Sequence, residues 1–140
     1  MKLRKMMMTM AAAAMLTVGT AASAFAAGLG TIDASALLQQ HPKYAQTMQS
    51  WQKDVKDAQT GFQKEIKGTT DQKAQQAILQ KYNARLNQQR IALFSPLEKD
   101  ILTKTQEVQK AKGLDYVVLN GSVVIGQAQD ITKDVAAKLK

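Results

Sequence analysis

The chain contains no cysteine among its 140 residues, and it has only one histidine and two prolines. Without cysteine it has neither disulfides nor thiol chemistry. The single histidine, His41, has no second histidine or cysteine to complete a zinc site, so we interpret it as a helix-end residue. No G-x-S-x-G, H-E-x-x-H or phosphate-binding glycine loop occurs. These absences predict a protein that is not an enzyme and that carries no metal or cofactor.

The first residues have the pattern of an export signal. Three positive charges within residues 1–5 precede an apolar run over residues 6–18, which is too short for a membrane-spanning helix. Ala24-Phe25-Ala26 is an A-x-A cleavage site, and Ala22-Ser23-Ala24 is a second choice. We therefore expect a signal peptide over residues 1–26, cleaved after Ala26 or Ala24, and a mature protein in the bacterial periplasm. A retained N-terminal anchor is the alternative.

Positive charge is concentrated in one segment of the mature chain. Removing Lys2, Arg4 and Lys5 lowers the formal net charge from +8 to +5. Residues 43–95 hold nine Lys or Arg against four Asp or Glu, whereas the rest of the mature chain holds seven of each. The whole excess therefore lies in residues 43–95.

The same segment has the apolar spacing of two long helices. Steps of three and four residues join the apolar positions of its first half, and leucines repeat every seven residues in its second half. These positions are Tyr44, Met48, Trp51, Val55, Ala58 and Phe62, then Leu79, Tyr82, Leu86 and Leu93. Gly68 can end the first helix, Thr70 or Asp71 can cap the second, and Pro96 predicts a break or kink at the far end.

Two limbs of equal length, residues 43–67 and 71–95, predict an antiparallel coiled-coil hairpin roughly 37 Å long. A reversal about Gly68 brings large apolar residues opposite one another. The expected pairs are Tyr44 with Leu93, Trp51 with Leu86, and Val55 with Tyr82. We interpret Trp51, Tyr82 and the leucine repeat as residues of the seam between the helices. Gln89 opposite Met48 weakens that seam.

The remaining segments, residues 27–42 and 96–140, predict a small α/β body. We expect a strand over residues 31–34, a helical turn through Leu37 and Leu38, and a helix after Pro96 that ends at Gly113. Residues 116–119 and 123–125 flank Asn120-Gly121, the favoured pair for a type I′ turn, and so predict a β-hairpin. Asp130 is expected to cap a last helix with its apolar side at Ile131, Val135 and Leu139.

The predicted fold class is therefore α+β: a small β-rich body with a long projecting helical hairpin. A body this small is marginal alone, and its short strands would leave unpaired edges. Oligomerisation through the body would address both problems. The residues we expect at such an interface are Ile32, Val117, Val118, Leu119, Val123, Val124 and Ile125.

Several motifs in this order resemble one known family. They are the I-D-x-x-x-L-L-x-x-H-P-x-Y pattern of residues 32–44, the proline at 96, the sequence GLDYVVL at residues 113–119 and Asp130-Ile131-Thr132. Over essentially the whole mature chain they resemble the OmpH/Skp family of periplasmic chaperones. The resemblance implies a jellyfish-shaped homotrimer that holds unfolded outer-membrane proteins without ATP and releases them for insertion. The arms here look shorter than those of the best-known members, which implies a smaller cavity.

The arm also offers physical candidates for client contact. Its basic side chains could attract acidic clients, and apolar groups beside the seam, including Met48 and Ile91, could touch client side chains. The candidates are Lys53, Lys56, Phe62, Lys64, Ile66, Lys67, Lys73, Lys81, Arg85 and Arg90. For any single lysine, a solvated helix face is an equally good interpretation.

Two other functions stay open from the sequence. One is an exported coiled-coil adaptor or envelope spacer that binds one folded partner. The other is a protein that binds anionic lipid or lipopolysaccharide, for which no residue can be assigned. Nucleic-acid binding rests on basic charge alone, and the expected export argues against it.

Overall fold

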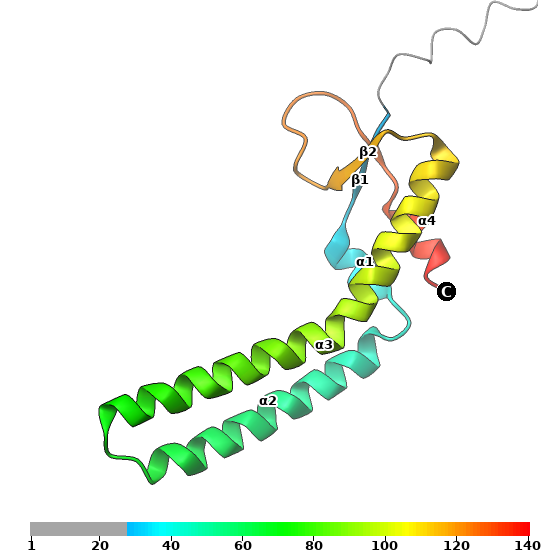
Figure 1. Ribbon diagram of the computed structural model, residues 1–140. Coiled ribbons are helices and arrows are strands. Elements are labelled where there is room, and N and C mark those ends of the chain that lie inside the picture. The colour runs from blue at the N-terminus through cyan, green and yellow to red at the C-terminus, as the bar shows by residue number, and fades with distance from the viewer. Residues whose placement is uncertain (1–27) are drawn as a thin grey trace, which may run out of the picture.

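A computed structural model describes residues 28–140 (Figure 1). The predicted signal peptide, residues 1–26, lies outside the described residues. Seven elements follow in order: β1 (Leu29–Ile32), α1 (Ala34–Gln40), α2 (Tyr44–Lys67), α3 (Gln72–Lys112), β2 (Tyr116–Leu119), β3 (Gln129–Asp130) and α4 (Thr132–Lys138). The expected combination of long helices with a small β-containing part is confirmed, and helix predominates.

The three strands form a small parallel sheet in the order β2-β1-β3. β1 pairs along its whole length with β2, and its other side pairs with the short β3. The first strand covers Leu29–Ile32, so the expected strand at residues 31–34 was placed about two residues too late. Helix α1 begins where that expectation still had a strand, because the Asp33 side chain accepts a hydrogen bond from the backbone N–H of Ala36.

The predicted β-hairpin at residues 116–125 is wrong. Residues 123–125 form no strand, and the side chains of Val124 and Ile125 are 91% and 93% exposed. A type I′ turn needs positive φ at both central residues, but here only Gly121 has it (φ 85°) and Asn120 does not. The Ser122 N–H donates to the Leu119 carbonyl over 3.1 Å, which fits a type II turn. The twist of a type II turn does not match that of paired strands and splays them apart, which disfavours a hairpin here.

The hydrophobic core lies where α1, α3 and α4 meet beside the sheet. Its buried side chains are Leu37, Ile101, Val108, Ile131, Val135 and Leu139. The apolar face predicted for the last helix is therefore confirmed. The expected cap at Asp130 is one residue too early, because Ile131 is the N-cap of α4 and makes no side-chain cap bond. The Asp130 carboxylate instead accepts hydrogen bonds from the N–H and hydroxyl of Thr132, the first residue of α4.

Helix α3 runs without interruption through Pro96, so the predicted helix break is wrong. Proline has no N–H and therefore removes one helical bond, the one to the Ala92 carbonyl, but it need not end a helix that is packed on both sides of it. Figure 1 shows α3 changing direction in its yellow-green part, between the portion beside α2 and the portion beside the sheet. The alternative expectation of a kink fits this change of direction.

Helices α2 and α3 lie side by side and antiparallel, joined by a short connection (Figure 1). We call α2 and residues 72–95 of α3 the arm, and the remaining described residues the body. Gly113 ends α3 in the left-handed conformation (φ 63°), as predicted. Gly68 ends α2 with a φ of −87°, which any residue can adopt.

Of the two caps proposed for α3, the structure uses Asp71. Its carboxylate accepts a 3.0 Å hydrogen bond from the Ala74 N–H. We expect Asp71→Ala to lower the free energy of unfolding by about 1 kcal/mol, because an orphan N–H of the first turn loses its acceptor. Urea denaturation followed by circular dichroism measures this. Thr70→Ala is the control and should change little; a larger loss from Thr70→Ala than from Asp71→Ala would contradict the assignment.

Candidate functional site

The contact between the arm helices centres on Ala58 of α2 and Tyr82 of α3, which are 1% and 7% exposed. The expected register placed Tyr82 opposite Val55. Instead, the Tyr82 ring packs edge-on against Phe62, with 5.9 Å between ring centroids, and its hydroxyl reaches Glu65. Tyr82 therefore contacts residues about two turns nearer the connection than predicted, and that part of the predicted register is wrong.

The direction of helical side chains explains this error. Side chains lean toward the N-terminus of their own helix. The N-terminus of α3 lies at the connection, so Tyr82 leans toward it, while Val55 leans away from it along α2. The predicted pairs were chosen by equal sequence distance from Gly68, which takes no account of these opposite directions of the two side chains.

Glu65, Lys81 and Tyr82 form a polar cluster on one side of this contact. Glu65 accepts hydrogen bonds from Lys81 Nζ (2.9 Å) and from the Tyr82 hydroxyl (2.8 Å). Two hydrogen bonds hold the pKa of Glu65 below its ordinary value. The bond from Lys81 has the larger effect and the bond from Tyr82 the smaller. Hydrogen bonding to Glu65 raises the pKa of both Lys81 and Tyr82. At neutral pH the cluster therefore keeps an anion, a cation and a neutral phenol.

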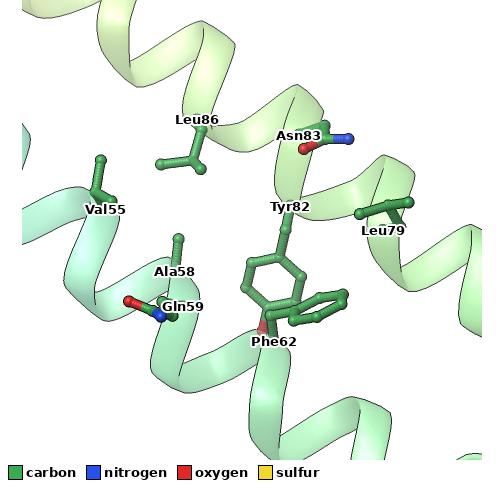
Figure 2. A pocket seen from close by; sticks show the side chains of 8 residues that line it. All are labelled: Val55, Ala58, Gln59, Phe62, Leu79, Tyr82, Asn83 and Leu86. Atoms are coloured by element: carbon green, nitrogen blue, oxygen red, sulfur yellow. The ribbon is translucent and has the colours of Figure 1, made fainter.

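A shallow apolar groove lies on the other side of Tyr82, with a volume of about 390 Å³ (Figure 2). Side chains of both helices point into it. Its lining comprises Val55, Ala58, Gln59 and Phe62 of α2 with Leu79, Tyr82, Asn83 and Leu86 of α3. We call this the arm groove. Leu79 is 48% exposed there, so its predicted burial in the seam is wrong: only two helices meet, and no third element covers it.

The predicted basic residues are all exposed but do not form one cluster. At 100° per residue, Lys81 and Arg85 lie on the opposite side of Tyr82 from Asn83, whereas Arg90 lies on the groove side. Lys73 lies on the face of α3 opposite Tyr82, away from the polar cluster and from the arm groove. The basic side chains thus surround the arm, and the arm groove itself carries almost no charge.

The apolar residues that we expect to contact clients also lie partly inside and partly outside the arm groove. Phe62 lines the groove, and Ile66 and Met48 are half-buried. Ile91 is 51% exposed but lies about 140° around α3 from Leu86, outside the groove. Val55, Leu79 and Leu86, which we had assigned to the seam, supply much of the accessible apolar surface. A seam between only two helices leaves its apolar residues partly exposed, so the sequence could have indicated that these three residues form an accessible surface.

The residues predicted for oligomerisation fall into three groups. Ile32 and Val117 pack against the core of their own chain, and Val118 and Val123 are half-buried. Leu119, Val124 and Ile125 are exposed. A groove of about 440 Å³ between α3 and β2 brings Val118 and Leu119 together with Leu102 and Tyr116, which are 59% and 66% exposed and which the sequence reasoning missed.

Metal-ligating side chains do not gather in the part of the chain that the structure describes. No group of three His, Asp or Glu side chains is arranged to hold a metal ion within residues 28–140. His41 caps the C-terminus of α1, as predicted, and bonds to Asp100, which was not foreseen. None of the described helices has the length and apolarity needed to cross a membrane.

Comparison with known proteins gives no matching family model and no matching curated protein. The likeness to the OmpH/Skp family therefore rests on its sequence motifs.

Tyr82 fits only because residue 61 has no side chain. A Cβ at Gly61 would lie 2.5 Å from the Tyr82 hydroxyl oxygen, which Glu65 and Phe62 hold in place. Alanine normally stabilises a helix by about 1 kcal/mol relative to glycine, but overpacking costs about 1–3 kcal/mol. We expect Gly61→Ala to lower the melting temperature in thermal denaturation.

The background Tyr82→Phe is the matched control, because it removes the one atom closer than 3.0 Å to that Cβ. In this background the cost of Gly61→Ala should shrink by more than half. A rise in melting temperature for Gly61→Ala in the native background would show that the close packing of Tyr82 is not a constraint.

Proposed function

We propose that this protein is an ATP-independent periplasmic holdase, which binds unfolded outer-membrane proteins and keeps them from aggregating before insertion. The observation that carries the proposal is the arm groove: an open, uncharged apolar surface on a helical arm that bears a net charge of +5. An unfolded chain offers no fixed shape, so a holdase needs many shallow contacts.

Strands of outer-membrane barrels suit such a surface. Their residues alternate between apolar and polar, so one face of an extended segment carries apolar side chains. The apolar floor of the arm groove can accept those side chains, while Gln59 and Asn83 can both donate and accept hydrogen bonds at its border. The surrounding lysines and arginines would attract acidic segments and keep a loaded arm soluble.

We also propose that the body associates into a homotrimer, from which the arms project as coiled-coil hairpins around a shared cavity. Within residues 28–140, one edge of β2 has no partner strand, and exposed apolar side chains surround it. Unpaired strand edges of this kind invite pairing with another chain. A second copy would cover Tyr116 and Leu119 and extend a core that is small for an independent domain.

The client-holding proposal predicts a specific role for basic residues near the connection. Replacing Lys64, Lys67 and Lys73 with Gln should weaken suppression of aggregation several-fold when urea-unfolded outer-membrane proteins are diluted, because attraction of acidic segments is reduced. Light scattering at a several-fold excess of the protein measures the effect. Suppression by the native protein should also fall as salt concentration rises.

A variant with the same loss of charge in the body is the control. Lys110, Lys133 and Lys140 are likewise exposed, and their replacement with Gln should leave suppression unchanged. If the native protein does not slow aggregation at all, the holdase proposal fails. Retention of one folded partner at fixed stoichiometry would then support an adaptor, and cosedimentation with anionic vesicles alone would support a lipid-binding protein.

The trimer proposal has its own test. We expect Leu119→Lys to convert the trimer to monomers, because it places a charge beside the unpaired edge of β2. Multi-angle light scattering gives the mass in solution. Ile91→Lys replaces an apolar side chain of similar exposure on the arm and should leave the trimer intact. A monomeric native protein, or a trimer that survives Leu119→Lys, would rule out this edge as the interface.

A further inference from the structure

His41 is a buried side chain with a bond on each ring nitrogen. Only 6% of its side chain is exposed. Nδ1 lies 3.1 Å from the backbone nitrogen of Lys43, and Nε2 lies 3.1 Å from Oδ2 of Asp100 on α3. Buried polar atoms need partners, so both bonds satisfy groups that water does not reach freely.

The contact with Lys43 fixes the tautomer of the ring. A backbone N–H can only donate, so Nδ1 of His41 must accept and carry no proton. In the neutral ring the proton then sits on Nε2, which donates it to the Asp100 carboxylate. The ring therefore links the backbone at the start of α2 to a side chain of α3.

The bond between His41 and Asp100 lies at the base of the arm, where it can affect the direction of the arm. The chain passes between body and arm at two places: the short segment between α1 and α2, and α3 itself near Pro96. His41 belongs to the first, and Asp100 lies about one turn beyond Pro96 in the second. Pro96 deprives α3 of one helical hydrogen bond there, so the helix alone resists bending less at this point.

We propose that the His41–Asp100 hydrogen bond is a latch that fixes the direction of the arm relative to the body. Leu97 and Ile101 are buried and hold the body side of α3 in place. The latch keeps a constant distance between α3 and the segment that joins α1 to α2. The proposal concerns the conformation of the arm and goes beyond the holding of clients. It stands whether or not the protein is a chaperone.

The absence of native cysteine makes a distance measurement direct. Spin labels on cysteines introduced at Lys73, near the end of the arm, and Lys133, in the body, report the arm direction by pulsed electron paramagnetic resonance. Labelled chains are diluted with unlabelled chains so that only distances within one chain contribute. Because the arm is roughly 36 Å long, each ten degrees of bending moves its end by roughly 6 Å.

Two substitutions at His41 separate the latch from the helix cap. His41→Asn retains an acceptor for the Lys43 N–H but cannot reach Asp100, and we expect the distance distribution to shift or broaden by several ångströms. His41→Gln places an amide nitrogen where Nε2 was and should keep the native distribution better. Asp100→Ala should reproduce the effect of His41→Asn.

Asp134→Ala is the matched control, because it removes a 3.1 Å ion pair with Lys112 that lies wholly within the body. It should leave the distribution unchanged, and circular dichroism should show equal helix content in all variants. Unaltered distributions in both His41→Asn and Asp100→Ala would overturn the proposal. So would a ¹⁵N spectrum of the native protein that places the ring proton on Nδ1.

Discussion

The continuity of α3 is the constraint on which the rest of the structure depends. One helix of 41 residues supplies Tyr82 to the arm contact and Ile101 and Val108 to the core of the body. Arm and body therefore cannot be positioned independently, although their compositions differ sharply. Helix α2 adds the second half of the arm, but it enters through the short segment after His41 and depends on α3 for its packing. A disturbance near Pro96 would thus reach both halves.

The sequence predicts those features that depend on local chemistry or on long periodic patterns. Asp71 at the start of α3, Gly113 at its end and the buried face of α4 all follow from residue type and spacing. The β-hairpin prediction failed because Asn120-Gly121 is a local signal, whereas β2 is fixed by pairing with β1, which lies more than eighty residues earlier. Pairing with β1 occupies one edge of β2, and within residues 28–140 no strand pairs with the other edge. The predicted break at Pro96 failed for a related reason, since packing on both sides can preserve a helix that loses one bond, whereas the alternative prediction of a kink fits the change of direction.

The candidate site was only partly predictable, because a seam of two helices is neither core nor surface. Heptad spacing correctly indicates that Tyr82 faces α2, but it does not tell which neighbouring residues lack a third helix to cover them. Leu79 and Leu86 thereby became the lining of an open groove. Near the other end of the arm, Gln89 has a buried side-chain oxygen without a partner in the described structure. The contact at Tyr82, toward the connection, has both an aromatic neighbour and a hydrogen bond to Glu65.

The sequence predicts that arm length limits the size of client that the proposed assembly encloses, but the direction of the arm also affects that size. An arm of roughly 36 Å that turns by ten degrees at its base moves its end by roughly 6 Å, which equals the length of about four helical residues. In the proposed trimer, three arms turning together would change the width of the cavity between them. If the holdase proposal is correct, the width available to a client depends on the junction of Pro96, His41 and Asp100, at the opposite end of the arm from the connection. In the proposed assembly a short arm need not imply a narrow range of clients, because release of the His41–Asp100 latch would let the junction adopt another angle.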